Sequence, residues 1–264
     1  MIPVASLQAY SDLLAPFRWA PVGNNLLIPA QVSEYIRQGC LSCEWTPDCL
    51  VFVRDVGSHA YLYFSARGED ARLPELPLDK PLILPLVTRG ATGAKGMEAL
   101  ALANGFRHLQ THNFMVVRAQ DFVPPQPPAW QPERVTDPDL LHRVHAYMIR
   151  YVTGIIEPFP ALEELAAFWV YAIRDPGTGE PVAGTLLKPF RSSFLVEHVF
   201  TKPTCRGRGL ATAVLGYAMG DAFSREPTGI VISWVDGENH PSIALHRRLG
   251  AVDSGKRSVQ YVRL

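Results

Sequence analysis

The segment 194–223 constrains the fold most, because it joins a strand pattern to a helix pattern through a turn rich in glycine. Residues 194–201 are mostly β-branched and aromatic, which is typical of a strand. Residues 210–223 are apolar at helical spacing. This segment lies among further expected elements, which are strands at 168–174, 181–187, 229–235 and 258–264 and helices at 140–152, 161–167 and 241–249. The pattern predicts an α/β or α+β fold with one mixed sheet and helices that connect its strands.

The turn itself has the chemistry of an anion site. Gly207 and Gly209 let the backbone approach a ligand closely, and the first N–H groups of the following helix are unpaired and carry partial positive charge. Arg206 and Arg208 add two cations, and no acidic residue lies between Glu197 and position 221. A pyrophosphate suits such a site. The alternative is an ordinary strand–helix turn with two solvated arginines.

Other phosphate loops do not match. A Walker loop needs Gly-Lys-Ser/Thr, and a dinucleotide fingerprint needs a third glycine where Thr212 stands. The segment instead resembles the Arg/Gln-x-x-Gly-x-Gly/Ala signature of the GNAT superfamily of acyl-CoA-dependent N-acyltransferases, which Arg206, Gly209 and Ala211 match in register. The resemblance covers about residues 133–264.

A second motif lies at the distance that the same family shows. Its pattern is Asn-x-x-Ala/Ser, then a Leu-Tyr pair, then Gly-Phe; the matching residues are Asn239, Ser242, Leu245 and Gly250. The tyrosine position holds His246 and the phenylalanine position holds Ala251. This departure puts the general acid in doubt and leaves the coenzyme A site intact.

The resemblance implies how acetyl-CoA binds. The pantetheine arm would lie between the strand ending at Thr201 and the strand 229–235, and backbone N–H groups near Phe200 and Thr201 would polarise the thioester carbonyl. The residues expected at the coenzyme A site are Phe200, Thr201, Arg206, Gly207, Arg208, Gly209, Leu210, Ala211, Asn239 and Ser242.

Two residues are candidates for proton transfer. Glu197 is the only carboxylate on the strand before the loop, and a carboxylate in a cleft can take the proton of an acceptor ammonium. His198 should point to the opposite face by strand alternation, so both cannot serve one cleft unless a bulge intervenes. His246 could protonate the departing thiolate. The alternatives are an ion-paired strand glutamate and a surface histidine beside Arg247.

The first half of the chain resembles the second half in its order of elements. Strands are expected at 50–54, 60–65, 82–88 and 113–118 and a helix at 96–103, and an offset of 145 residues aligns Ala99, Leu100, Gly105, Val117 and Arg118 with identical residues. The gap 66–81 is too short for the strand, glycine loop and helix of the second half, and it contains three prolines. We therefore expect a degenerate GNAT-like domain at 1–123 that binds no acyl-CoA and forms one wall of the acceptor pocket. A proline-rich linker at 124–132 and an acetyltransferase domain at 133–264 are expected to follow.

Composition limits the classes of partner that this chain is expected to bind. Lys and Arg total 25, as do Asp and Glu, so no excess charge favours nucleic acid or membrane. No signal peptide or span of about 20 apolar residues is evident, so a cytoplasmic protein is expected. Cys40 and Cys43 have the spacing of half a zinc site without a second pair, and with Cys49 they are expected to be free thiols; no metal is expected.

The expected activity is transfer of an acetyl group from acetyl-CoA to an amine, carried by a small molecule or a peptide, by direct attack on the thioester. Two alternatives stay open. One is a non-catalytic acyl-CoA sensor, which the histidine at the tyrosine position allows. The other is a transferase that uses aminoacyl-tRNA, which the balanced charge disfavours. The sequence does not identify the acceptor or the oligomeric state.

Overall fold

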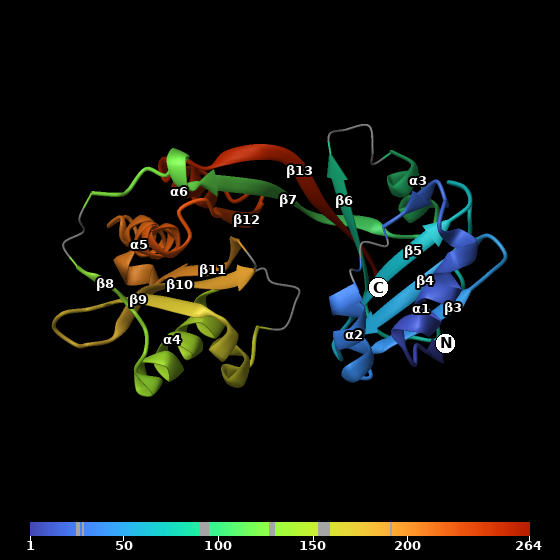
Figure 1. Ribbon diagram of the computed structural model, residues 1–264, viewed down its shortest axis with the longest axis horizontal. Coiled ribbons are helices and arrows are strands. Elements are labelled where there is room, and N and C mark those ends of the chain that lie inside the picture. The colour runs from blue at the N-terminus through green and yellow to red at the C-terminus, as the bar shows by residue number, and fades with distance from the viewer. Residues whose placement is uncertain (25–26, 28, 90–94, 127–129, 153–158, 191) are drawn as a thin grey trace. The chain divides into compact units, whose positions relative to one another are not determined.

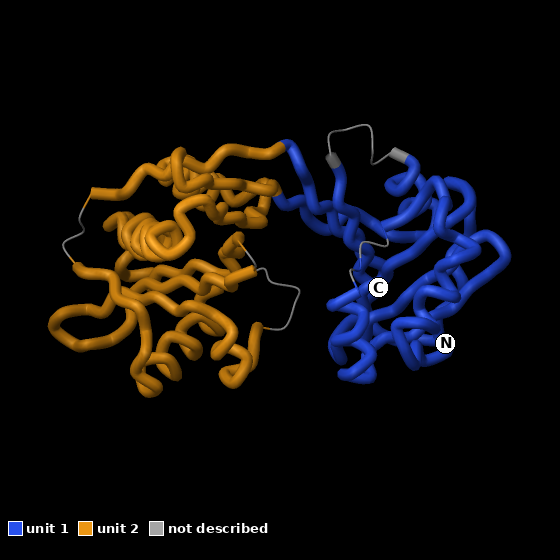
Figure 2. Tube along the Cα trace, viewed as in Figure 1, with its two compact units in different colours: residues 1–112, 255–264 blue, residues 113–254 orange. Residues whose placement is uncertain are grey.

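The computed structural model divides the chain into two compact units, residues 1–112 with 255–264 and residues 113–254 (Figures 1 and 2). It describes residues 1–24, 27, 29–89, 95–126, 130–152, 159–190 and 192–264. The centre of the proline-rich segment, residues 127–129, lies outside the described residues, and its flanks belong to the second unit. Each unit has its own buried core.

The first unit is a mixed sheet with helices. Its strands are β1 (Ile2–Pro3), β2 (Val22–Gly23), β3 (Leu41–Trp45), β4 (Cys49–Asp55), β5 (Ala60–Ala66) and β6 (Leu82–Arg89), and its helices are α1 (Leu7–Leu14), α2 (Pro29–Arg37) and α3 (Lys95–Ala103). The strand order is β1-β3-β4-β5-β6, with β2 beside β5. Neighbouring strands are antiparallel except for β5 and β6, which pair in parallel.

The second unit is a mixed sheet covered on both faces. Its elements are β8 (Pro132–Arg134), α4 (Pro138–Tyr151), β9 (Trp169–Arg174), β10 (Pro181–Phe190), β11 (Ser193–Thr201), α5 (Leu210–Arg225), β12 (Ile230–Asp236) and α6 (His240–Arg248), with short 3-10 helices at Leu162–Ala167 and Pro203–Cys205. The order is β12-β11-β10-β9-β8, with β11 and β12 parallel. One apolar cluster packs α5 on the sheet and another packs α4 on the other face.

Two long strands cross the boundary between the units. β7 (Arg107–Arg118) begins in the first unit and ends in the second, where Met115 and Val117 are buried in the core beneath α5. β13 (Val252–Arg263) ends in the first unit, where it pairs antiparallel with β6 and buries Tyr261. The sequence interpretation assigned residues 258–264 to the second domain, whereas the last ten residues of the chain lie in the first unit.

The internal repeat appears in the secondary structure. Helices α3 and α6 begin at Lys95 and His240, and strands β7 and β13 begin at Arg107 and Val252, so both pairs are 145 residues apart. Both helices exit through a glycine at positive φ, Gly105 at 77° and Gly250 at 90°. The offset found from five identities is therefore the offset of the elements.

The first half lacks the helix that the second half has between its parallel strands. Residues 67–81, which join β5 to β6, contain no helix, as the prolines predicted. The parallel pair β5–β6 shows that the strand equivalent to β11 is present, so the expectation that this strand was missing too is wrong. What the first unit lacks is the glycine loop and the helix.

Elements before residue 48 were not predicted. Helix α1 buries only Tyr10 and helix α2 only Val32. Further residues of both helices are partly buried in the same cluster, and these are Leu13, Leu14, Tyr35 and Ile36. Each helix therefore has a short apolar period that the sequence interpretation missed.

Candidate functional site

Strand β11 contains a β-bulge at Glu197. The register of β11 with β10 pairs Leu186 with His198 and Leu187 with Val196, so Glu197 has no opposite residue on β10. A bulge resets the alternation of side chains along a strand. Val196 and Val199, three residues apart, both pack with the core beneath α5, while Phe200 packs with α4. Glu197 and His198 therefore both face the α4 side, which is the condition under which they can serve one cleft.

His198 is held by an aromatic contact on that face. Its ring stacks on Phe159 with centroids 4.6 Å apart. Phe159 also contacts the ring of His145, whose Nε2 lies 2.8 Å from the carbonyl oxygen of Pro160. Burial lowers the pKa of His198 to about 4, so this imidazole is uncharged at neutral pH. The sequence could not place it beside Glu197, because the bulge is not visible in the residue pattern.

The pairing of strand β11 with its parallel neighbour ends at the bulge. The last pair between β11 and β12 is Val196 with Ser233, although β11 continues to Thr201 and β12 to Asp236. The Lys202 N–H donates to Val182 of β10 at 2.8 Å. By ladder alternation, the Phe200 N–H also points to β10, and the Thr201 N–H points to the edge that faces β12. Of the two amides expected to polarise a thioester, the geometry favours Thr201.

Two buried polar atoms of the second unit have no hydrogen-bond partner in the described part of the chain. They are the hydroxyl oxygen of Thr201 and the Nε2 atom of His246. A buried polar group without a partner costs about 1–3 kcal/mol. The sequence assigned Thr201 to the coenzyme A site and His246 to proton transfer, and each atom is satisfied if a bound molecule supplies the partner.

The glycine loop follows β11 directly and keeps its surface open. Gly207 and Gly209 have φ of 76° and 73°, in the left-handed region, and a Cβ at either would meet no atom within 4 Å. Gly209 is the N-cap of α5 and provides no side-chain cap, so the N–H groups of Leu210 and Ala211 point out of the helix end. This arrangement suits an anion that approaches the backbone.

The two arginines of the loop differ in their contacts. The Arg208 guanidinium lies 4.2 Å from the centroid of the Trp130 ring. The Arg206 Nε lies 3.4 Å from the carbonyl oxygen of Thr201, which places its guanidinium at the end of β11. Both side chains are exposed.

The second motif forms the start of α6. The Asn239 side chain accepts a hydrogen bond from the Ser242 N–H at 3.1 Å, so Asn239 caps this helix. His246 is 2 % exposed, so the alternative of a surface histidine is wrong. Its Nδ1 lies 2.8 Å from the Ser242 carbonyl oxygen, and burial lowers its pKa. Helices α5 and α6 pack against each other.

The structure thus brings the predicted site residues together in two groups. Glu197, Phe200, Thr201 and residues 206–211 lie on one continuous strand, loop and helix. The second group, which consists of Asn239, Ser242 and His246, lies on the helix packed against α5.

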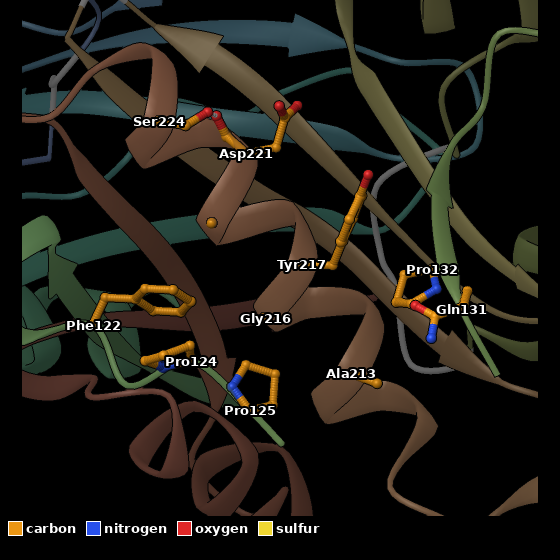
Figure 3. Close-up of a pocket in the computed structure, with 11 residues that line it drawn as sticks. Phe122, Pro124, Pro125, Gln131, Pro132, Ala213, Gly216, Tyr217, Asp221 and Ser224 are labelled. Atoms are coloured by element: carbon orange, nitrogen blue, oxygen red, sulfur yellow. Dashed lines mark hydrogen bonds between the residues drawn. The ribbon is translucent and has the colours of Figure 1, made fainter. Parts of the chain in front are cut away.

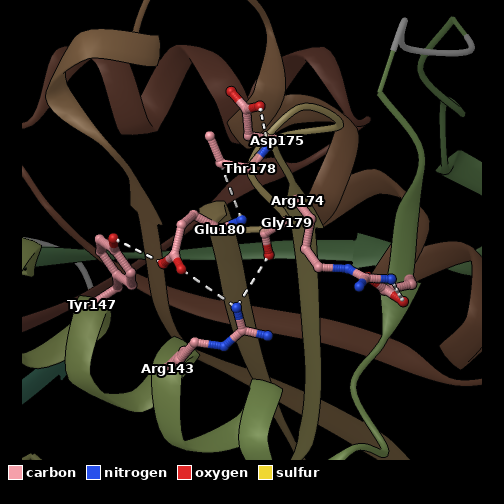
Figure 4. A network of polar contacts seen from close by, with 8 residues as sticks. Arg143, Tyr147, Arg174, Asp175, Thr178, Gly179 and Glu180 are labelled. Atoms are coloured by element: carbon pink, nitrogen blue, oxygen red, sulfur yellow. Dashed lines mark hydrogen bonds and ion pairs between the residues drawn. The ribbon is translucent and has the colours of Figure 1, made fainter.

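A polar network holds α4 near the end of β11 (Figure 4). Arg143 and Tyr147 project from α4 toward Glu180, at the start of β10, and the Tyr147 hydroxyl donates to the carboxylate at 3.2 Å. The Tyr147 ring stacks on Phe200 with centroids 6.3 Å apart. The network therefore fixes α4 over the face to which Glu197 and His198 point.

A separate pocket of about 460 Å³ lies along α5 (Figure 3). Asp221, one of the polar residues that line it, accepts hydrogen bonds from Tyr171 at 2.7 Å and Arg225 at 3.1 Å. None of the predicted site residues lines it; the lining is Phe122, Pro124, Pro125, Gln131, Pro132, Ala213, Gly216, Tyr217, Gly220, Asp221 and Ser224.

Gly216 and Gly220 form a stripe of small residues on one face of α5. A Cβ on Gly216 would lie 2.5 Å from Pro125, and one on Gly220 would lie 3.8 Å from Phe122. The stripe therefore accommodates the segment after β7.

The cysteines are free, with Cys43, Cys49 and Cys205 buried and Cys40 half-buried. Across the described residues, no group of three or more His, Cys, Asp or Glu side chains could hold a metal ion. No helix in the described ranges is both long and apolar enough to cross a membrane.

Comparisons with known proteins agree with this geometry. Residues 120–251 match the family model described as the acetyltransferase (GNAT) family. No curated protein matches the chain. Among solved structures, a tandem GNAT protein from the clavulanic acid biosynthesis pathway is similar over 99 % of this chain and 97 % of its own, with a TM-score of 0.66 and 14 % identity.

Two further structures share the fold. A GCN5-related N-acetyltransferase from Kribbella flavida covers 88 % of this chain and 92 % of its own at 19 % identity and a TM-score of 0.59. One from Sphaerobacter thermophilus covers 96 % and 91 % at 16 % identity and a TM-score of 0.59. The matches over nearly the whole chain are consistent with a tandem arrangement of two GNAT-like halves.

Proposed function

The chain belongs to the acetyltransferase (GNAT) family, whose model matches residues 120–251, and from this premise we propose that it transfers an acetyl group from acetyl-CoA to an amine. The observation that carries the proposal is the opening between β11 and β12. Their ladder ends at Val196 and Ser233, and β11 continues beyond that point to Thr201, whose buried hydroxyl lacks a partner in the described part of the chain. An extended arm with amide groups can add to such a strand edge.

The coenzyme A end of the co-substrate belongs at the glycine loop. Backbone N–H groups from residues 207–211 and the guanidinium of Arg206 supply donors and positive charge to a pyrophosphate. Asn239 contributes by fixing the start of α6. The acetyl carbonyl is polarised by the Thr201 N–H, which costs no reorganisation because the strand holds it in place.

The acceptor amine belongs on the α4 side of β11. Glu197 takes a proton from the acceptor ammonium, and the neutral nitrogen then attacks the thioester carbon. The carbon–sulfur bond breaks as the amide forms, and the products are the acetylated amine and coenzyme A. Amines on small molecules and on peptides are the candidate acceptors.

The decisive experiment has two parts. Calorimetric titration with acetyl-CoA measures binding, and release of free thiol in the presence of alkylamines, amino acids, amino sugars and a peptide amine measures turnover. Binding without turnover on any amine would favour the acyl-CoA sensor. Transfer of the aminoacyl group from added aminoacyl-tRNA to an amine, with no release of thiol, would favour the other alternative. Absence of binding would contradict the proposal.

The role of Glu197 has its own test. Glu197→Gln should lower turnover about 10²-fold, because general-base catalysis contributes about 10²–10⁴-fold, and should leave the acetyl-CoA dissociation constant nearly unchanged. Glu163→Gln, at an exposed position, is the matched control. Joint loss of binding and turnover in Glu197→Gln would indicate a structural role instead.

A further inference from the structure

His246 is a buried histidine with one satisfied and one unsatisfied ring nitrogen. The residue is 2 % exposed. Its Nδ1 lies 2.8 Å from the carbonyl oxygen of Ser242, one turn earlier in α6. Its Nε2 is fully buried and has no partner within the described residues.

The partner of Nδ1 fixes the tautomer. A carbonyl oxygen can only accept a hydrogen bond, so Nδ1 must carry the proton. In the neutral ring, Nε2 then carries a lone pair and no proton. Nε2 could donate a proton only from the imidazolium form, and burial lowers the pKa of this ring and disfavours that form. The structure thus presents an acceptor where an acid was expected.

The position of His246 indicates which molecule supplies the missing donor. Ile243 and Leu249 of α6 pack in the same core as α5, the helix that starts at the glycine loop. Glu197 and His198, by contrast, face the α4 side. His246 is three residues from both Ile243 and Leu249 along α6, so its ring lies on the α5 side of the sheet, where the glycine loop starts, and not on the α4 side.

We propose that His246 Nε2 accepts a hydrogen bond from the arm of coenzyme A and does not protonate the departing thiolate. The inference rests on the proposed function. The arm offers two amide N–H donors in every acyl form and a thiol S–H donor once the acyl group has left. His246 touches the co-substrate in this role and is a binding residue.

The proposal changes the proton path. Glu197 removes one proton from the acceptor ammonium, and the amine that attacks still carries two. When the carbon–sulfur bond breaks, the sulfur takes its proton from this nitrogen, directly or through water. Atoms and charges balance without a proton from the protein.

Nuclear magnetic resonance tests the tautomer directly. In the full-length, ¹⁵N-labelled protein, two-bond proton–nitrogen correlations report which nitrogen of each imidazole is protonated, with exposed His142 as internal reference and His246→Gln for assignment. We expect a proton on Nδ1 and none on Nε2 of His246 at neutral pH. A proton on Nε2 in the free protein would overturn the proposal.

Addition of ligands tests the acceptor role. Coenzyme A and acetyl-CoA are each added to saturation, as judged by calorimetry, and the Nε2 resonance should move upfield as it accepts a hydrogen bond. A shift with both compounds identifies an amide donor, and a shift with coenzyme A alone identifies the thiol. No shift with saturating ligand refutes the role. If neither compound binds, the proposed function fails and the ligand assignment fails with it, while the tautomer is still read in the free protein.

Kinetics separate the two roles of His246 in a different way. Loss of one neutral hydrogen bond predicts that His246→Phe weakens acetyl-CoA binding about 2- to 10-fold, with turnover at saturation nearly unchanged. His246→Gln, which retains an acceptor oxygen, should keep part of the affinity. If His246→Phe instead slowed turnover by about two orders of magnitude or more, the size of a lost general acid, and left affinity unchanged, His246 would be the acid and the proposal would be wrong.

Discussion

Gly209 allows backbone strain to be separated from ligand contact. Its φ is 73°, and a Cβ at this position would meet no atom within 4 Å. Gly179, in the turn between β9 and β10, has φ of 70° and equally open surroundings. Both lie in the second unit, yet only Gly209 belongs to the loop. Gly209→Ala and Gly179→Ala are therefore a matched pair.

The two variants should lose the same stability. A residue with a Cβ pays about 1–2 kcal/mol in the left-handed region, and neither substitution adds a clash. At about 2–4 °C for each kcal/mol in a chain of this size, the melting temperature should fall by about 2–8 °C in both. Thermal denaturation followed by circular dichroism measures this effect.

Only Gly209→Ala should lose acetyl-CoA affinity. Its Cβ occupies the open space through which a pyrophosphate reaches the N–H groups of the loop. Each hydrogen bond to a charged group is worth about 1.5–3 kcal/mol, and about 1.4 kcal/mol is tenfold in affinity. One lost bond therefore weakens binding by roughly tenfold or more, and Gly209→Val should block it. Equal affinity in Gly209→Ala, Gly179→Ala and the wild type would refute the site.

The remaining predictions concern the core and the bulge. A fragment of residues 130–264 should fail to melt cooperatively, because it lacks Met115 and Val117, each 1 % exposed, and burial of two such side chains is worth about 3–6 kcal/mol. A fragment of residues 113–254 retains both side chains and should melt cooperatively. Similar melting of the two fragments would contradict the assignment of β7. The pKa of His198 is lowered to about 4, so the unfolded state binds its proton first, and the free energy of unfolding should fall by up to about 3 kcal/mol as pH drops from about 6.5 to 4. Urea denaturation at pH 7 and pH 5 should show a smaller fall in His198→Gln, and an unchanged pH dependence would count against the buried neutral ring.

Local patterns predicted the segment that carries the chemistry. The β-branched run before the loop, the glycines at 207 and 209, and the apolar run after them predicted β11, the turn and α5 within a few residues. Asn239 predicted the start of α6. These features depend on contacts a few residues apart along the chain, and caps and positive φ angles are set by the residue itself.

Internal similarity predicted the repeat for a related reason. Identities at a constant offset, such as Gly105 with Gly250, mark helix exits with the same backbone conformation in both halves. The short gap with prolines predicted that the first half has no helix between its parallel strands. Chain length and proline chemistry are properties of the sequence alone.

The tertiary structure decided what the site can do. The bulge that brings Glu197 and His198 to one face depends on register with β10, and register is a property of two strands. The burial of His246 depends on how α6 packs, and the acceptor role that we propose for its Nε2 atom depends on that burial. The crossing of β7 and β13 between the units is likewise a matter of pairing between distant segments. The sequence determined which residues are available, and long-range packing determined which faces they share, because the free energy of burial depends on the neighbours that the fold supplies.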